Sequence, residues 1–413
     1  ELLNLQFTTG DGLPLGGIAR VGPGETLVVE EGRVVERYHR PALPEGRPTP
    51  RGQEAALAEL DRLLHDSVDL HQRADVPYGM FLSGGIDSAA LLSLMGELNE
   101  RPVLAFTAGF PDTAVHDERD RAAAVARACG AEHVEVPVTA EDLWSLLPEV
   151  AAAMDDPAAD YAVLPTYKLA REARRAVKVI LSGEGGDEVF GGYGRYRHAM
   201  RPWPLRKRAR RRGALEGFDI LRAETLDWRD GVAHAERAAG RAGWTRMQAA
   251  QAVDCRDWLP NDLLTKLDRC LMAHGVEGRV PFLDPDLAAF GFRLPDRLKV
   301  RGRLGKWVLR SWLDRRLPEA GAFERKRGFT VPVGAWIAAR GRELGPLVAR
   351  WPAVADCCRP DAVEALFAGL ESGGEKRAAV AAWRLLFFAL WHRHHVARRP
   401  LIPDVFEALA DRP

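Results

Sequence analysis

Cysteine, lysine and long apolar runs are all scarce in this chain of 413 residues. Its five cysteines form no CxxC pair, which excludes a disulfide framework and a zinc knuckle as the basis of the fold. No apolar run is long enough for a membrane span and there is no signal-peptide pattern, so we expect a soluble, cytoplasmic protein with no membrane partner. Lys+Arg and Asp+Glu both total 58, and this lack of a basic excess argues against nucleic acid as a partner.

The scarcity of lysine is the most unusual of these features, because the basic residues are almost all arginine. The lysines are Lys168, Lys178, Lys207, Lys266, Lys299, Lys306, Lys326 and Lys376. This bias is typical of a GC-rich genome. A lysine ammonium is a compact point charge, whereas an arginine guanidinium is a planar fork, so each remaining lysine marks a position where the point charge can matter.

The length predicts two or three domains. Within the first 50 residues, Gly24–Tyr38 is predicted to form two short strands around a turn at Glu31-Gly32, and proline-rich Pro41–Pro50 is predicted to be a linker. A two-stranded piece cannot bury a core by itself. We therefore expect it to pack on the rest of the chain or to end a domain that lies upstream.

From Arg51 onward, predicted helices and strands alternate, which indicates a parallel sheet covered by helices on both faces. Ligands of such sheets bind beyond the carboxyl ends of the strands. After Tyr196 no further strand is expected, and the remainder is predicted to be mostly α-helical. The strands are predicted at Val76–Leu82, Val103–Ala108, His133–Val138 and Val177–Leu181, and the helices at Glu54–Gln72, Ser88–Leu98, Asp117–Cys129, Glu141–Met154 and Thr166–Arg175.

The first candidate site is Leu82-Ser83-Gly84-Gly85-Ile86-Asp87-Ser88, between a predicted strand and a predicted helix. Two glycines let the backbone turn sharply and let amide groups face an anion, and a helix N-terminus favours the same anion. Asp87 would repel a phosphate unless it holds Mg²⁺. A plain turn capped by Asp and Ser would account for Ser-Gly-Gly alone, but the whole motif in this position favours a phosphate site. No GxxxxGK[ST] motif is present.

The second candidate site is Ser182-Gly183-Glu184-Gly185-Gly186-Asp187-Glu188, which also follows a predicted strand. Both glycine-rich turns should therefore open at the same edge of the sheet. Three acids in one short turn repel one another unless a metal or a cationic substrate compensates, so an ordinary surface turn is the weaker interpretation.

Two lysines of the helical half form a third candidate group. They stand in Gly305-Lys306-Trp307-Val308-Leu309-Arg310 and in Glu324-Arg325-Lys326-Arg327-Gly328-Phe329. A single lysine on a helix is normally solvated, and only its persistence in an arginine-rich chain favours a functional role.

Together these motifs resemble the synthetase domain of the glutamine-hydrolysing asparagine synthetases, and the first turn resembles the pyrophosphate loop of PP-loop ATP pyrophosphatases. Asp268-Arg269, Met272-Ala273-His274 and Glu277–Asp284 carry the same resemblance. It implies an α/β fold: a parallel five-stranded PP-loop (adenine nucleotide alpha hydrolase-like) sheet flanked by helices, followed by a mostly α-helical C-terminal half. It also implies a synthetase domain over residues 51–413, divided into a PP-loop core (51–200) and a helical part (201–413).

The resemblance implies a two-step, ATP- and Mg²⁺-dependent reaction. A carboxylate, with L-aspartate as the first choice, attacks the α-phosphorus of ATP, and ammonia then displaces AMP from the acyl-adenylate to give asparagine. The implied site residues are as follows: Ser83, Gly84, Gly85, Asp87 and Ser88 bind pyrophosphate, Asp87 and Asp187 bind Mg²⁺, and Leu82, Ala108, Ser182 and Gly183 line the adenosine pocket. By the same resemblance, Lys306 neutralises pyrophosphate, Lys326 stabilises charge at the reacting centre, and Glu184 orients the amine or accepts its proton.

The sequence departs from this family in its first 50 residues, which resemble only the C-terminal remnant of an N-terminal-nucleophile glutaminase domain plus a linker. Glutamine-dependent members begin with a catalytic cysteine, whereas the first cysteine here is Cys129, in a predicted helix. We therefore expect ammonia to come from a glutaminase portion encoded upstream, from a partner chain, or from free ammonia. A homodimer is compatible with the resemblance.

Several alternatives stay open. Related amidotransferases and macrolactam-forming synthetases share the ATP chemistry and act on peptide, cell-envelope or polysaccharide carboxylates. The β-lactam-forming branch places Tyr where Glu184 stands, which argues against it. An RNA-modifying PP-loop enzyme should have a basic face and often catalytic cysteines. A non-catalytic scaffold would have no need to retain Asp87, Glu184, Asp187, Lys306 and Lys326 together.

Overall fold

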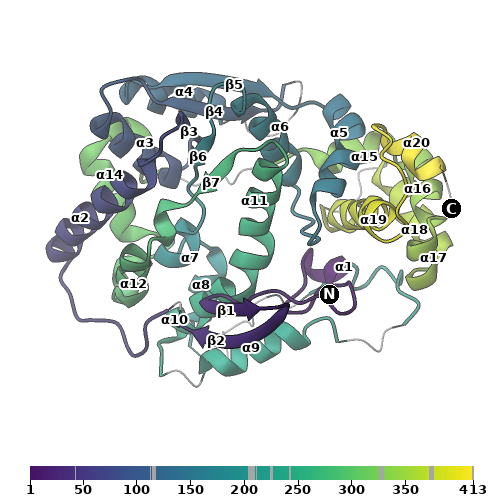
Figure 1. Cartoon of the computed structure of the whole chain (residues 1–413), viewed down its shortest axis with the longest axis horizontal. Coiled ribbons are helices and arrows are strands. Elements are labelled where there is room, and N and C mark those ends of the chain that lie inside the picture. The colour runs from purple at the N-terminus through teal and green to yellow at the C-terminus, as the bar shows by residue number, and fades with distance from the viewer. Residues whose placement is uncertain are drawn as a thin grey trace.

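The computed structural model of the chain describes residues 1–41, 43–111, 113, 118–202, 210, 212–223, 227–240, 243–324, 330–371 and 376–411. Its centre is a sheet of five parallel strands in the order β5-β4-β3-β6-β7 (Figure 1). This arrangement confirms the predicted α/β fold. The strands are β3 (Tyr78–Phe81), β4 (Leu104–Gly109), β5 (Glu132–Pro137), β6 (Val179–Leu181) and β7 (Glu277–Arg279).

Strand β7 corrects the expectation that no strand follows Tyr196. It pairs in parallel with β6, with Ile180 opposite Gly278. The strand consists of one glycine between Glu277 and Arg279, so it contains none of the apolar alternation by which strands are predicted. Backbone pairing alone defines it, and the Ser182 amide extends this pairing by donating to the Arg279 carbonyl at 2.8 Å.

The sheet separates two hydrophobic cores, as a parallel sheet with helices on both faces must. Val179 and Leu181 of β6 belong to one core and Ile180 to the other, because successive side chains of a strand point to opposite faces. The first core is covered by α2 (Gln53–Gln72), α3 (Ile86–Leu98), α4 (Arg119–Ala128), α12 (Pro285–Arg293) and α14 (Trp307–Arg316). The second is covered by α5 (Ala140–Ala153), α6 (Val163–Ala173) and α11 (Thr265–Met272).

Predicted and observed helices agree in number and order between residues 51 and 175, and their ends differ by a few residues. Helix α3 begins at Ile86 rather than at Ser88, which places Asp87 in its first turn. Helix α5 begins after Thr139, whose hydroxyl accepts from the Asp142 amide while the Asp142 carboxylate accepts from the Thr139 amide. This reciprocal capping satisfies two amides that the helix leaves unpaired.

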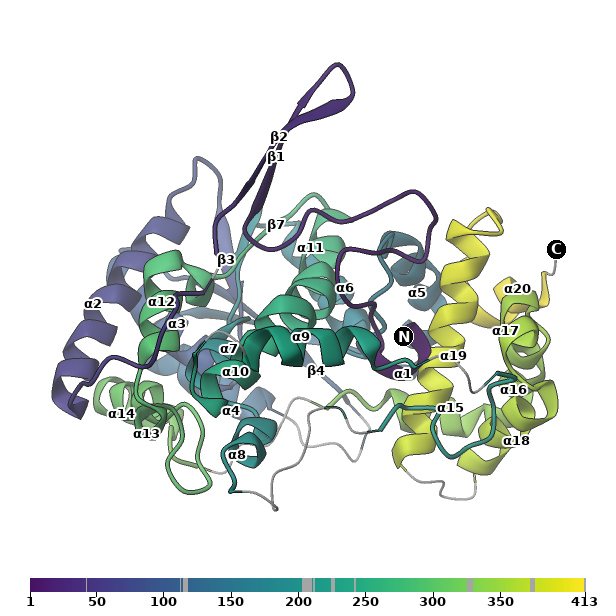
Figure 2. The same cartoon turned by 90° about the horizontal axis from the view of Figure 1, so that it is seen from below.

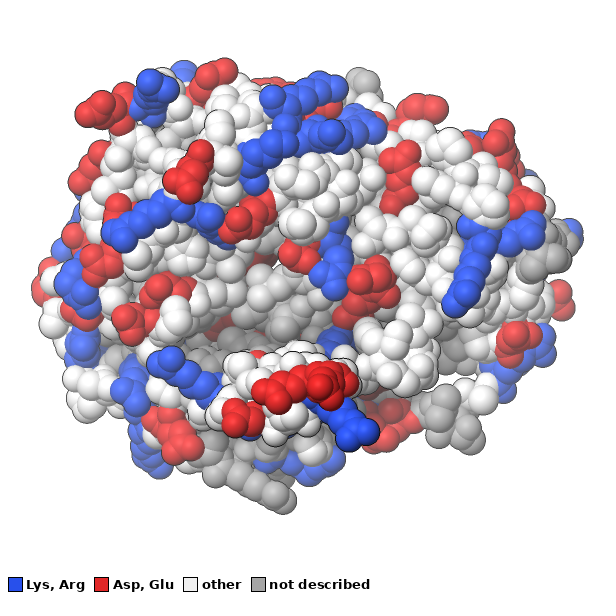
Figure 3. Space-filling view, viewed as in Figure 1, with Lys and Arg blue, Asp and Glu red and all other residues white. Residues whose placement is uncertain are grey.

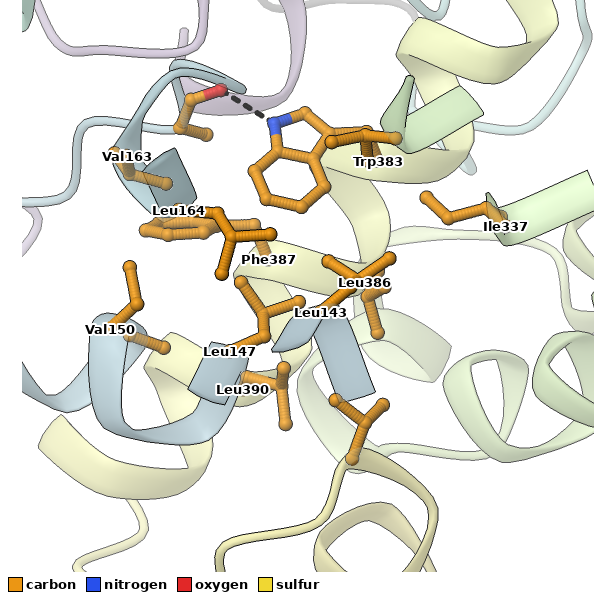
Figure 4. Close-up of a cluster of buried hydrophobic side chains, with 14 of the residues drawn as sticks. Leu143, Leu147, Val150, Val163, Leu164, Ile337, Trp383, Leu386, Phe387 and Leu390 are labelled. Carbon is orange, nitrogen blue, oxygen red and sulfur yellow. Dashed lines mark hydrogen bonds between the residues drawn. The ribbon is translucent and has the colours of Figure 1, made fainter. Parts of the chain in front are cut away.

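The second half is mainly helical, as predicted, and most of it extends the second core. Trp383, Phe387 and Leu390 of α19 (Lys376–His395) pack against Leu147 of α5 and Leu164 of α6 (Figure 4). The other elements of this half are α8 (Gly194–Ala199), α9 (Asp230–Gly240), α10 (Arg246–Val253), the π-helix η1 (Asp254–Leu264), η2 (Pro281–Leu283), α13 (Asp296–Lys299), η3 (Pro318–Ala320), α15 (Val333–Ala339), α16 (Gly341–Ala349), α17 (Pro352–Cys357), α18 (Pro360–Leu370) and α20 (Val405–Ala410).

The N-terminal segment forms a short helix, α1 (Leu2–Leu5), and the predicted ribbon of β1 (Glu25–Glu30) and β2 (Arg33–His39). The ribbon turns at Glu31 and Gly32, both at positive φ, and it projects from the body (Figure 2). Its apolar side chains are unusually open to solvent, with Val29 57% exposed and Tyr38 54% exposed. In the space-filling view, the face of the molecule is hollowed beside the ribbon and carries both signs of charge interspersed (Figure 3).

Residues before the ribbon are joined to η1 and to the segment after α5 by hydrogen bonds. The Gln6 side-chain amide donates to Asp262 Oδ2 at 2.8 Å, and the Gly10 amide donates to Asp257 Oδ1 at 2.8 Å. The Arg20 guanidinium makes a two-pronged ion pair with Asp156, just after α5. This segment therefore packs on the remainder of the chain, while the predicted division at residue 50 stays a prediction.

No helix within the described ranges is both long and apolar enough to cross a membrane. The predicted cytoplasmic location stays a prediction.

Candidate active site

Two short turns meet at the carboxyl edge of the sheet, one after β3 and one after β6. These strands are neighbours, and β3 lies where the strand order reverses, so the turns leave the sheet in adjacent positions. The first turn is held by its own hydroxyls. The Ser83 amide donates to Ser88 Oγ at 3.3 Å, Ser88 Oγ donates to the Gly85 carbonyl at 3.1 Å, and Gly84 has a φ of +69°. The turn thus directs the N-terminus of α3 toward the edge of the sheet.

Glycine is required where the second turn approaches the first. A Cβ on Gly183 would lie 3.0 Å from Asp87 Cβ, and one on Gly186 would lie 2.7 Å from Asp87 Oδ1. The helix α7 (Gly186–Phe190) begins at this contact and carries Asp187 in its first turn. The two turns therefore bring Asp87 and Asp187, which are far apart in the sequence, to the same place.

Lys306 joins these two carboxylates. Its ammonium nitrogen lies 2.5 Å from Asp87 Oδ2 and 2.7 Å from Asp187 Oδ1, and the residue is 1% exposed. Burial disfavours the charged form, but the two carboxylates outweigh it and raise the pKa of Lys306 above its ordinary value. The residue caps α14 in the left-handed conformation, at φ 56°, so the ammonium enters the site from the helical half.

The donor set around Asp87 fits a magnesium ion. Asp87 Oδ1 is buried and has no hydrogen-bond partner in the part of the chain that the structure describes, so one lone-pair side of this carboxylate is available. No three His, Cys, Asp or Glu side chains among the described residues are grouped to hold a metal alone. Mg²⁺ is commonly held by one or two carboxylates together with water and substrate phosphates, which agrees with a site of only Asp87 and Asp187.

A cavity of about 400 Å³ opens in front of the two turns. Every residue predicted to bind ATP lines it, together with Glu184 and Asp187. The predicted residues are Leu82, Ser83, Gly84, Gly85, Asp87, Ser88, Ala108, Ser182 and Gly183. Lys306 does not line the cavity but lies behind it, in contact with the two carboxylates. Lys326 lies outside the described residues, so its predicted role stays a prediction.

Glu184 lines the cavity and forms an ion pair with a lysine that lies outside the predicted motifs. Its Oε1 lies 3.2 Å from the Lys266 ammonium, which also contacts Asp160 Oδ2 at 3.4 Å. Lys266 comes from α11 and Asp160 from the segment before α6, so three distant parts of the chain form this group. The sequence contained one signal for Lys266, its place among the few lysines, and no signal for Asp160.

A further acid, Glu188, lies behind Asp187. Glu188 is 1% exposed, and the Tyr193 hydroxyl donates to its Oε1 at 2.7 Å. Burial, and then repulsion by Asp187, raise the pKa of Glu188 to about 8. The third acid of the glycine-rich turn is therefore mostly neutral near pH 7, which reduces the repulsion that three adjacent carboxylates would otherwise produce.

Two arginines also line the cavity, and the resemblance assigns a role to neither of them. The Arg310 Nε donates to the Gly305 carbonyl at 2.9 Å, and Arg121 donates to the Gly321 carbonyl at 3.0 Å. Guanidinium groups from α14 and α4 thus add positive charge to a wall that is otherwise rich in carboxylates. In a chain so rich in arginine, composition gives no reason to select these two.

Comparison with known protein sequences shows which family the chain is similar to. The sequence model of the asparagine synthase family matches residues 59–393, which include every described residue of the site. A Mycobacterium tuberculosis (strain ATCC 25618 / H37Rv) protein provisionally named asparagine synthetase (glutamine-hydrolyzing) is 33% identical over 415 residues, which cover 91% of this chain and 63% of that protein. Asparagine synthetase (glutamine-hydrolyzing) 1 of Bacillus subtilis (strain 168) is 28% identical over 441 residues, covering 97% of this chain and 69% of that protein.

Asparagine synthetase B (glutamine-hydrolyzing) of Escherichia coli (strain K12) is 27% identical over 333 residues, which cover 76% of this chain and 51% of that protein. The chain thus spans less than two-thirds of the length of the mycobacterial relative. The family match, in contrast, extends over most of the chain and includes both glycine-rich turns and the Lys306 segment. The chain therefore belongs to the asparagine synthase family.

Proposed function

We propose that this chain is an ATP- and Mg²⁺-dependent ligase that forms an amide from a carboxylate and ammonia. The observation that carries the proposal is the pair Asp87 and Asp187, brought together from two glycine-rich turns and bridged by the buried ammonium of Lys306. When bound by these carboxylates, Mg²⁺ would supply charge neutralisation for phosphate oxygens. The relatives are named asparagine synthetases, which supports asparagine as the product and hence L-aspartate as the carboxylate. AMP and pyrophosphate are the proposed co-products.

The residues of the chain divide the work between binding and proton transfer. The backbone of Gly84 and Gly85 and the hydroxyls of Ser83 and Ser88 surround the position proposed for pyrophosphate, at the N-terminus of α3. Leu82, Ala108, Ser182 and Gly183 line the part of the cavity proposed for adenosine. In the first step a carboxylate oxygen bonds to the α-phosphorus and pyrophosphate leaves.

In the second step the amine nitrogen bonds to the acyl carbon, the bond to AMP breaks, and AMP leaves with its electron pair. Glu184, which lines the cavity, is the proposed acceptor of the proton that the nitrogen loses. We further propose that residues 1–50 belong with a glutaminase-type unit that supplies the ammonia. The valines and the tyrosine of the projecting ribbon are exposed, which supports a contact between the ribbon and that glutaminase-type unit.

The test follows pyrophosphate release with ATP, Mg²⁺, ammonium chloride and a panel of carboxylates. We expect release with aspartate, and loss of release in Asp87→Asn and Asp187→Asn because each removes one metal ligand and one partner of Lys306. Asp66→Asn is the matched control, since Asp66 is exposed and pairs with Arg62 at the surface of α2. Release of pyrophosphate with a peptide or sugar acid but not with aspartate would contradict aspartate as the substrate. Full activity of Asp87→Asn or Asp187→Asn would contradict the role proposed for that carboxylate.

A further inference from the structure

The group formed by Glu184, Lys266 and Asp160 is arranged asymmetrically about its ammonium. The side chain of Lys266 is 6% exposed and that of Asp160 is 10% exposed, whereas that of Glu184 is 25% exposed. The ammonium therefore has a buried carboxylate on one side and a more open carboxylate on the other. A lysine that only neutralised Asp160 would have no need of a second carboxylate.

Asp160 is fixed independently of Lys266. Its Oδ1 accepts from the Ala162 amide at 3.0 Å, in the turn that leads into α6, and its Oδ2 faces the ammonium. Both oxygens of Asp160 are thus engaged by groups with little freedom to move. Lys266 itself starts from α11, which packs against α6, so the ammonium is held at a defined point in the cavity wall.

The charge of Lys266 is maintained by its neighbours. Burial disfavours the ammonium, but Glu184, Asp160 and Asp262 outweigh burial and raise the pKa of Lys266 well above its ordinary value. The titratable groups that surround it come from every neighbouring element: Glu184 from the turn after β6, Asp160 and Tyr161 from the segment before α6, Asp262 from η1, and Cys270 from α11 itself. The ammonium is therefore a permanent positive charge next to Glu184.

We propose that Lys266 is a positioning residue for amide formation: anchored by Asp160, its ammonium holds the Glu184 carboxylate in the cavity wall, where it can receive the proton of the attacking amine. The inference rests on the proposed function and specifies one of its steps. Lys266 pairs with Glu184 and Asp160, whereas the groups proposed for adenylation, Asp87, Asp187 and Lys306, pair with one another. Loss of Lys266 should therefore affect the second step and spare the first.

The central experiment separates the two steps in Lys266→Met and Lys266→Arg. ATP–pyrophosphate exchange with the carboxylate measures adenylation without ammonia, and amide formation with ammonium chloride measures the complete reaction. For Lys266→Met we expect a loss of about 100-fold in kcat for the amide, the scale of a displaced general base. Exchange and the KM for ATP should stay within about 3-fold of the wild type, a change too small for loss of a binding group. Lys266→Arg keeps the charge and should recover at least about a tenth of the lost activity.

Lys266→Met alone leaves the carboxylates of Asp160 and Glu184 without their cation. A double variant therefore distinguishes positioning of Glu184 from neutralisation of Asp160. Lys266→Met/Asp160→Asn removes the ammonium together with its buried partner. If Lys266 only neutralises Asp160, the double variant recovers amide formation, and the proposal fails. If Lys266 positions Glu184, the double variant regains thermal stability while amide formation stays about 100-fold reduced.

Failure of this inference can be told apart from failure of the proposed function. A wild-type chain that catalyses no pyrophosphate exchange with any carboxylate contradicts the proposed function itself. A wild-type chain that forms the amide, alongside a Lys266→Met variant that loses exchange and amide formation equally, contradicts only the positioning role.

Discussion

Lys299 is predicted to make the stability of the protein depend on pH, and Lys299→Met should remove that dependence. The residue is fully buried at the C-terminal end of α13, where its nitrogen donates to Gln251 Oε1 at 2.8 Å and to the Phe292 carbonyl at 2.7 Å. Both acceptors are neutral. Burial therefore dominates, only partly opposed by Asp296, and lowers the pKa of Lys299 from 10.5 to about 7.

The sign and size of the effect follow from proton linkage. Between pH 7 and pH 10.5 the unfolded chain binds a proton at Lys299 that the folded chain does not bind, so the free energy of unfolding rises with pH in this interval. Each pH unit contributes about 1.4 kcal/mol, and the whole difference between 10.5 and about 7 corresponds to about 5 kcal/mol. Below pH 7 the folded protein carries the buried charge and this penalty is constant.

Urea unfolding at pH values from about 6 to 9.5, followed by tryptophan fluorescence, measures the effect. The difference in unfolding free energy between the wild type and Lys299→Met should be constant below pH 7 and should then grow in favour of the wild type by about 3 kcal/mol up to about pH 9.5. Lys178→Met removes an exposed lysine and is the matched control, for which the difference should stay flat. A constant difference for Lys299→Met over the whole range would refute the reasoning.

Two further substitutions test the site and the core. Gly192→Ala should reduce pyrophosphate release about 100-fold without unfolding the protein, because the added Cβ would overlap Asp187 Oδ1 and Lys306 Cε. Its control is Gly369→Ala, where the added Cβ meets open space. Full activity of Gly192→Ala would show that the contact between Asp187 and Lys306 is dispensable. Leu147→Ala should lower the free energy of unfolding by about 3 kcal/mol, since Leu147 is fully buried between α5 and α19. Leu401→Ala at a 47% exposed leucine should change it by less than about 0.5 kcal/mol, and equal effects of the two leucine variants would contradict the assigned core.

The parallel sheet could be predicted because its central strands are apolar runs between helices of clear periodicity. Met80 and Leu181 lie in such runs, and the structure places both in the sheet. Strand β7 could not be predicted, because Glu277, Gly278 and Arg279 contain no apolar pattern and pair only through their backbone. The predicted start of α3 lies two residues late because Ile86 follows two glycines, which are poor helix formers but tolerate the turn before a helix.

In the candidate site, too, only the residues that stand in local sequence patterns could be predicted. Its two turns could be selected from the sequence because glycines and acids follow predicted strands there. Lys306 could be selected because lysine is scarce in the chain and because its segment resembles the family. Lys266 and Asp160 could not be selected in this way, since their meeting depends on how α11 packs against α6 rather than on local sequence. The position of Lys306 behind the cavity, between two carboxylates, also depends on the left-handed cap of α14.

The hydrogen bonds between the first twenty residues and η1 bear on how such proteins can exchange modules in evolution. Replacing everything before the proline-rich stretch would remove Gln6 and Gly10, the donors to Asp262 and Asp257. Both carboxylates are buried, so the loss of their hydrogen-bond donors would be destabilising. Asp262 lies one turn before Lys266, the partner of Glu184, so the change would occur next to the site. A recombination that keeps these hydrogen bonds would therefore join the two modules before Gln6 rather than at the apparent linker.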